Sequence, residues 1–169
     1  MLRVSPALGR IAERQKKQVE KLKLRSNVEI ESLSPRFKPY VQTILFHLEG
    51  KGWVPVVYHG ERSKEEQTRI VKAGHSKTMQ SFHVTDTALN RSRNGLHWQV
   101  KGEAADIVDA RFLWSGPAAD LNFQFWKDLG AMAKSMGLKW GGDWKKFRDV
   151  AHVEHTHLEI SQDSRGVRV

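Results

Sequence analysis

The most informative part of the chain reads Trp140-Gly141-Gly142-Asp143-Trp144, followed after a short gap by Asp149-Val150-Ala151-His152-Val153-Glu154. We expect a strand on each side of it, over residues 138–140 and about 153–160. The stretch joins acidic residues to a histidine, which supply the oxygen and nitrogen ligands of a zinc site built without cysteine. It therefore predicts a polar site at a junction between loop and strand.

Upstream of this stretch, helical and extended patterns alternate along the chain. Apolar residues at helical spacing, β-branched runs and a capping box distinguish the elements from one another. A polar segment without steady periodicity interrupts them and predicts a long loop or hairpin. The predicted elements are a helix over 34–50, a strand over 53–58, a helix over 63–74, the loop over 75–102, a strand over 104–108 and a helix over 117–136.

This order favours an α+β fold in which helices pack against a small, mainly antiparallel sheet. The 169 residues suit a single domain with a real core. With 39% hydrophobic and 28% charged residues, the composition is that of a globular protein and excludes a fully disordered chain. Cysteine is absent, which excludes disulfides and cysteine-based zinc sites.

Positive charge is concentrated at the N-terminus. Residues 1–28 hold eight Lys and Arg against two Glu, and so supply +6 of the net charge of +9. Leu8, Ile11, Val19 and Leu22 recur at near-helical spacing beneath this charge. We divide the chain into a basic arm or surface helix over 1–33, a catalytic domain over 34–161 and a tail over 162–169. The arm is either a solvated surface or a segment that binds a polyanion through its positive charge.

No stretch is apolar enough for a membrane span, and the N-terminus lacks the apolar core of a secretory signal. We therefore expect synthesis in the cytoplasm without a signal peptide. Action elsewhere would require release by another factor. Five of the eight histidines lie near acidic residues at the predicted junctions between loop and strand. These five are His83, His97, His152, His155 and His157.

Two further patterns complete a family signature. Ser81-Phe82-His83 precedes Gly102-Glu103-Ala104-Ala105-Asp106, and both precede the Trp-Gly-Gly-Asp-Trp and Asp-x-x-His elements. Over residues 36–160 the sequence resembles the LAS-type zinc peptidases, the D-Ala-D-Ala carboxypeptidase and L-alanyl-D-glutamate endopeptidase family that includes many phage endolysins. The resemblance implies a single-domain fold like that of the hedgehog and D-Ala-D-Ala peptidases.

The resemblance also implies roles for individual residues. His83, Asp106 and His152 stand where the family holds zinc, and Asp149 matches its catalytic carboxylate. Arg62 matches an arginine that contacts substrate and the developing oxyanion. Ser81 and Gln67 match supporting positions at the substrate or behind the ligands.

Two ambiguities stay open at this point. Residues 84–101 form an insertion in the family pattern, so His97 competes with His83 as a ligand. Separately, Glu154-His155-Thr156-His157 places a carboxylate three residues before His157, and Glu154 and His157 could replace Asp149 and His152. Alternation along a strand argues against the second arrangement, because Glu154 would face away from His155 and His157. We prefer His83, Asp106 and His152.

The resemblance implies a zinc-dependent peptidase that hydrolyses the L-alanyl-D-glutamate bond of bacterial peptidoglycan. The alternatives are a D-Ala-D-Ala carboxypeptidase or dipeptidase, and a non-enzymatic basic module that binds nucleic acid or an anionic wall polymer. We expect a monomer that acts on the cell wall after release by a separate pore-forming protein, and no nucleic-acid partner. Trp98 and Trp114 either line the groove or pack in the core.

Overall fold

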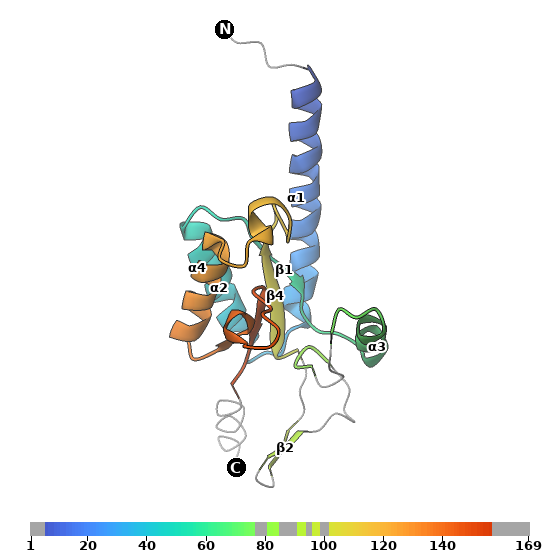
Figure 1. Cartoon of the computed structure of the whole chain (residues 1–169), viewed down its shortest axis with the longest axis vertical. Coiled ribbons are helices and arrows are strands. Elements are labelled where there is room, and N and C mark those ends of the chain that lie inside the picture. The colour runs from blue at the N-terminus through green and yellow to red at the C-terminus, as the bar shows by residue number, and fades with distance from the viewer. Residues whose placement is uncertain (1–5, 77–80, 85–90, 94–95, 99–101, 157–169) are drawn as a thin grey trace.

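A computed structural model describes residues 6–76, 81–84, 91–93, 96–98 and 102–156. An antiparallel sheet with strand order β1-β4-β6-β5 lies at its centre, and helices surround it (Figure 1). The predicted α+β fold is confirmed. The helices are α1 (Pro6–Ser32), α2 (Lys38–Gly50), α3 (Lys64–Lys72) and α4 (Gln124–Ser135), with short 3-10 helices η1 (Gly116–Ala119) and η2 (Gly141–Asp143). The strands are β1 (Pro55–His59), β4 (Ala104–Asp109), β5 (Lys139–Trp140) and β6 (His152–Glu154), and β2 (Arg91–Arg93) pairs with β3 (Leu96–Trp98) as a separate hairpin.

Strand register gives the sheet two different faces. Ala105 of β4 pairs with Val153 of β6, and both belong to the apolar core. The next pair along these strands, Asp106 and His152, points to the opposite face because successive side chains alternate. Consecutive residue pairs of these strands therefore face the core and a polar face in turn. On the polar face, the Asp106 carboxylate lies directly opposite the His152 imidazole.

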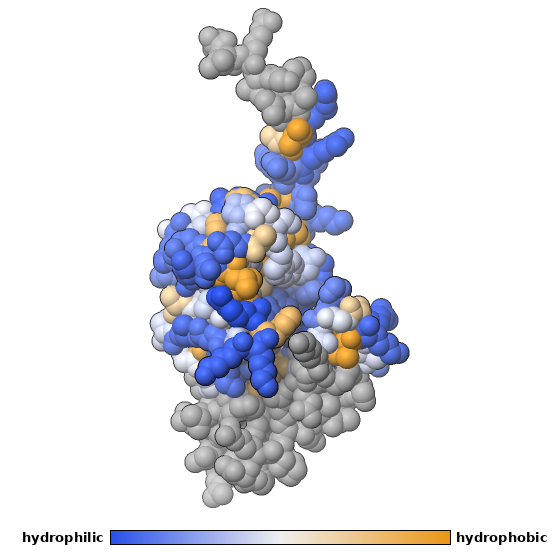
Figure 2. Space-filling view, viewed as in Figure 1, coloured by the Kyte–Doolittle hydropathy of each residue, from blue (hydrophilic) through white to orange (hydrophobic). Residues whose placement is uncertain are grey.

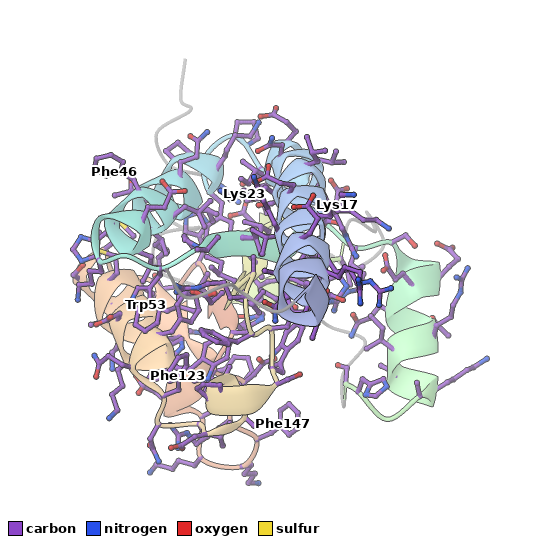
Figure 3. All side chains as sticks on the ribbon, turned by 90° about the horizontal axis from the view of Figure 1, so that it is seen from above. Lys17, Lys23, Phe46, Trp53, Phe123 and Phe147 are labelled. Carbon is purple, nitrogen blue, oxygen red and sulfur yellow. The ribbon has the colours of Figure 1, made fainter. Side chains whose placement is uncertain are left out.

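The core lies between the sheet and the helices α2 and α4, which also pack against each other. Phe125 and Leu129 of α4 and Ile44 of α2 are fully buried there. At the edge of this core, the rings of Trp53 and Phe123 point toward each other, with centroids 5.5 Å apart (Figure 3). Each fully buried side chain of this size stabilises the fold by about 1.5–3 kcal/mol.

The prediction of one continuous helix over 117–136 is wrong for the residues before 124. The chain forms η1 and then a bend, and α4 begins only at Gln124. The Asp120 carboxylate accepts a hydrogen bond from the Asn122 backbone N–H at 2.8 Å, which competes with helical bonding. Leu121 is exposed in consequence. The strand predicted over 153–160 begins one residue earlier, at His152, and ends at Glu154.

The second half of α1 covers the free edge of β1, where the described part of the chain places no other strand. Ser26 accepts a hydrogen bond from the Val57 N–H through its hydroxyl at 2.8 Å, and the Glu29 carboxylate accepts one from Gly60 N–H at 2.9 Å. The first half of α1 extends beyond the body, and its surface is mainly hydrophilic (Figures 1 and 2). Of the predicted apolar stripe, Val19 and Leu22 are half-buried and Ile11 is exposed.

Some residues named in the predictions lie outside the part of the chain that the structure describes. This holds for His157, for the Leu8 side chain, and for the side chains of His97 and Trp98, although the backbone of the last two belongs to β3. The hairpin of β2 and β3 lies within the segment predicted as a long loop or hairpin. Among the described residues, the helices include none with the length and apolarity needed to cross a bilayer.

Candidate metal centre

Three side chains converge on the polar face of the sheet. His83 Nε2 lies 3.3 Å from Asp106 Oδ1, and His152 Nδ1 lies 3.2 Å from the same oxygen. The two imidazole nitrogens are 3.2 Å apart. We call these three atoms the His-Asp-His triangle. The sequence predicted these residues as ligands, and the structure brings them together from a loop, β4 and β6.

The triangle has the dimensions of a zinc site. Nitrogen and oxygen ligands lie 2.0–2.2 Å from zinc, so tetrahedral ligands are separated by about 3.3 Å. The three measured edges of 3.2, 3.2 and 3.3 Å match this spacing. Two histidines and a carboxylate also form a donor set that zinc accepts, with a fourth position left for water or substrate. The residues therefore fit the ion that the sequence predicted.

A further contact holds each histidine of the triangle in orientation. His83 Nδ1 lies 2.6 Å from the Gly60 carbonyl oxygen, to which it donates, so that Nε2 is left for a metal. His152 Nε2 lies 3.0 Å from Glu154 Oε2, which leaves Nδ1 for the triangle. Glu154 thus contacts the ring nitrogen of His152 that faces away from the triangle. This contact indicates that Glu154 orients the His152 ring and is not itself a ligand.

Carboxylates dominate the electrostatics of this site. Burial opposes ionisation of Asp106, but the charge of His83 and a hydrogen bond from His152 hold the pKa of that carboxyl well below its usual range. Burial alone would lower the pKa of His152, yet hydrogen bonds to Asp106 and Glu154 raise it to about 10. The surroundings therefore favour positive charge at the triangle, which a divalent cation would supply in competition with a proton.

The Trp-Gly-Gly stretch explains how Asp149 and His152 are positioned. The buried Trp140 indole donates from Nε1 to the Val150 carbonyl at 2.8 Å, which anchors the loop that precedes β6. A Cβ on Gly142 would lie 2.1 Å from the Trp140 ring, and one on Gly141 would lie 2.4 Å from the Asp149 carbonyl oxygen. Only glycine allows both approaches, so the motif is a packing requirement of this loop.

Asp149 lines the same cavity as the triangle. Burial and then the neighbouring negative charge of Asp106 raise the pKa of its carboxyl. A raised pKa makes a carboxylate a better proton acceptor, as a general base requires. The structure therefore places the Asp149 carboxylate at the cavity that the triangle lines, and its role as a general base stays a prediction.

Comparison with known proteins agrees with this geometry. A family model described as D-alanyl-D-alanine carboxypeptidase, of peptidase family M15, matches residues 74–155. The match to this M15 peptidase model covers a little under half of the chain. The matched region contains the whole triangle and Asp149.

Individual members of the M15 family match over more of the chain. An L-alanyl-D-glutamate peptidase of Listeria phage A118 is 30% identical over 84% of this chain and 44% of its own length. The peptidoglycan L-alanyl-D-glutamate endopeptidase CwlK of Bacillus subtilis (strain 168) is 27% identical over 72% of each protein. The chain thus spans less than half of the phage relative.

The fold matches a solved M15 structure as well. The L-Ala D-Glu endopeptidase ChiX of Serratia marcescens superposes with a TM-score of 0.52 and 21% identity. The match covers 81% of this chain and 90% of the ChiX chain. This likeness confirms the predicted type of fold.

The supporting positions predicted from the M15 pattern lie around Arg62. This buried guanidinium donates from Nη1 to Gln67 Oε1 at 2.8 Å, and its Nη2 lies 3.5 Å from Asp106 Oδ2. Gln67 in turn donates to the Ser76 hydroxyl at 3.1 Å. The Ser81 hydroxyl accepts from the His83 N–H at 3.3 Å and so fixes the turn that carries this histidine.

The triangle opens into a cavity of about 970 Å³. Arg62, Ser81, Asp149 and Trp114 all line it, so that Trp114 lies in the groove and not in the core. His59 also lines the cavity, with Nδ1 3.6 Å from Asp106 Oδ2. Sequence reasoning missed His59, because a single histidine at the end of a strand carries no ligand spacing.

Proposed function

We propose that the protein is a zinc-dependent peptidoglycan peptidase that hydrolyses the L-alanyl-D-glutamate bond of bacterial stem peptides. One observation carries the proposal: a triangle of zinc-ligand dimensions opens into a cavity that Asp149 also lines. The activity named for the phage A118 and Bacillus relatives supports this bond. The wall substrate also suits a chain of net charge +9, since peptidoglycan carries free carboxylates.

His83, Asp106 and His152 would hold the zinc ion. When bound, zinc supplies a Lewis acid that polarises the scissile carbonyl and lowers the pKa of water. Asp149 accepts the proton of the attacking water and passes it to the leaving amine. Arg62 contributes positive charge beside the reacting carbonyl oxygen, and Gln67 holds its guanidinium in place. Ser81 maintains the turn that carries His83.

A D-Ala-D-Ala carboxypeptidase is the second candidate, because this activity gives the matching family model its description. Either reaction requires the same zinc site and base. The two differ in product: one releases a peptide with D-glutamate at its amino terminus, and the other releases D-alanine. The enzyme would reach the wall after release from the cytoplasm by a separate pore-forming protein, and would act there as a monomer.

The test is digestion of purified peptidoglycan by the zinc-loaded protein, with mass spectrometry of the fragments. We expect new D-glutamate amino termini and complete loss of activity in EDTA. Asp149→Asn should lower the rate by about 10²–10⁴-fold, the usual contribution of a general base. Asp143→Asn is the matched control, since Asp143 is exposed and pairs with Lys134 at 3.0 Å.

Three results would contradict the proposal. Wall cleavage that persists in EDTA would exclude a metal-dependent reaction. Salt-sensitive wall binding without any cleavage product would favour the non-enzymatic basic module. Release of D-alanine alone would select the carboxypeptidase.

A further inference from the structure

The cavity that contains the triangle has one apolar side, which we call the apolar rim. It is formed by Trp114, Leu121, Trp144 and Phe147. Eight large hydrophobic side chains are exposed among the described residues, and these four line this single cavity. The others lie on α1 and α2, and Phe46 of α2 points away from the body (Figure 3). A concentration of exposed apolar surface at a cavity is typical of a binding site.

Contacts from the body of the protein hold the apolar rim in place. Trp114 packs edge-on against Tyr58 of β1, with ring centroids 4.9 Å apart. Arg148 donates from Nε to the Gly142 carbonyl at 2.9 Å and from Nη2 to the Leu121 carbonyl at 3.4 Å. Arg148 therefore ties together the two chain segments that form the rim. The rings remain partly exposed, at 42% for Trp114 and 50% for Phe147.

The other side of the cavity is mainly polar. Arg62, His75, Ser76 and Ser81 line it, and the apolar exceptions are Ile70 and Phe82. These residues come from α3 and the segments around it, which Figure 1 shows on one side of the sheet. The triangle thus lies in a cavity with one apolar side and one polar side.

The substrate of the proposed function has a matching asymmetry. On the acyl side of an L-alanyl-D-glutamate bond lie the alanine methyl group, a lactyl group and the muramic acid sugar, and none carries a charge. On the amine side lie D-glutamate and the rest of the stem peptide, which carry carboxylates. Apolar side chains suit the first and polar side chains suit the second, because unpaired charges are costly to desolvate.

We propose that the apolar rim binds the muramic acid sugar ring on the acyl side of the scissile bond. Aromatic rings offer a flat apolar face to the C–H groups of a pyranose while the sugar hydroxyls stay in water. One alanine residue, about 3.8 Å long, and the lactyl carbons separate that ring from the reacting carbonyl. The rim lies at a comparable distance from the triangle, since the centroid of the Trp144 ring is 5.0 Å from that of the His152 ring.

This inference rests on the proposed function and adds a specificity: the enzyme distinguishes glycan-linked stems from free peptide. The test compares two substrates with the same scissile bond, a disaccharide tetrapeptide and an N-lactyl tetrapeptide that lacks the sugar. We expect kcat/KM to be about tenfold higher for the first, in the range that one or two aromatic contacts supply, mainly through KM. Phe147→Ala and Trp114→Ala should reduce this preference to about two- to threefold, because they should lower kcat/KM more for the disaccharide substrate than for the N-lactyl peptide.

Phe46→Ala is the matched control, because Phe46 is 79% exposed and lies on α2, away from the cavity. It should leave the preference intact. Equal kcat/KM values for the two substrates in the unaltered enzyme would overturn the sugar site while leaving the proposed function standing. Equal losses on both substrates in the rim variants would also overturn it. Failure to cleave either substrate would instead reject the proposed function.

Discussion

Two clusters of histidine and carboxylate lie on the same pair of neighbouring strands and differ in what surrounds them. One is the His-Asp-His triangle. The other joins Glu103, just before β4, to His155, just after β6, through a short hydrogen bond between His155 Nδ1 and the Glu103 carboxylate. We call this second group, together with Arg36, the structural cluster. Both clusters are buried, so burial and residue type alone do not identify a metal site.

Charge balance separates the two clusters. In the structural cluster, Arg36 donates from Nε to Glu103 Oε1 at 2.8 Å and so supplies the countercharge from within the protein. Around the triangle, Asp106, Glu154 and Asp149 contribute three carboxylates, with Arg62 and Lys139 as nearby cations. With both imidazoles neutral, as metal ligands require, the three carboxylates outnumber the two cations, and the remaining negative charge attracts a divalent cation.

Access separates them as well. The His155 ring packs against Phe37 and Tyr40, with centroids 4.8 and 5.3 Å away. His83, Asp106 and His152 line the cavity, whereas neither His155 nor Glu103 does. The same chemistry thus stabilises the fold where a cation and aromatic rings enclose it, and forms a reactive site where three ligand atoms face open space.

The largest expected effect comes from removing the charge of Asp106. Asp106→Asn should reduce zinc binding and lower kcat/KM by about 10³-fold, because the metal contributes several kcal/mol to the transition state. Zinc content by mass spectrometry and hydrolysis rates would measure this. The matched variant Glu103→Gln should keep its zinc. Loss of zinc from both variants would show that the two clusters are not functionally distinct.

A smaller effect is expected at Glu154. Glu154→Gln removes the charge behind His152 Nε2, and contacts of this kind contribute about 10–100-fold to metal affinity. Competition with a chelator would measure the change in zinc affinity. At saturating zinc we expect most of the activity to return. A permanent loss of activity at full zinc occupancy would instead give Glu154 a direct role in the reaction.

At the structural cluster we expect a loss of stability and not of chemistry. Glu103→Gln breaks a buried, charge-assisted pair and should lower the free energy of unfolding by about 1–3 kcal/mol. Urea denaturation would measure it, and activity per folded molecule should be unchanged. An unaltered midpoint of unfolding would contradict a stabilising role.

The smallest effect concerns pH. Burial raises the pKa of Glu103, but hydrogen bonds from His155, Ser34 and Arg36 outweigh burial and lower it below its ordinary value of 4.5. The contribution of Glu103 to stability is therefore present above about pH 4.5 and is lost as the pH falls through the lowered value. The difference in unfolding free energy between the native protein and Glu103→Gln should shrink on acidification. A difference that grows with acid would contradict this sign.

Local patterns predicted most of the elements, and the family resemblance implied the members of the triangle. The choice of His83 over His97 came from its Ser-x-His context, and the structure places His83 against Asp106 and His152. The insertion between His83 and Gly102 does not prevent this, because lengthening a loop costs little free energy. The side chain of His97 is outside the described part of the chain, so its exclusion as a ligand stays a prediction.

Contacts between distant segments could not be predicted in the same way. The approach of His59 to Asp106 depends on the pairing of β1 with β4, and on a register shift between Val57 and His59. The late start of α4 depends on Asp120, whose competing turn is invisible to a pattern of apolar spacing that continues through Leu121. The first case depends on strand register and the second on one side-chain hydrogen bond, and a periodic pattern of apolar residues shows neither.

The hydrogen bonds between α1 and β1 make the basic helix inseparable from the sheet. Without Ser26 and Glu29, the N–H groups of Val57 and Gly60 would face solvent along an open strand edge, which is a template for strand addition between molecules. Shortening the chain to remove its positive charge is therefore safe only within the projecting first half of α1. A longer deletion would expose the edge of β1 and favour self-association, so that any defect of the shortened chain would not show that the positive charge was needed.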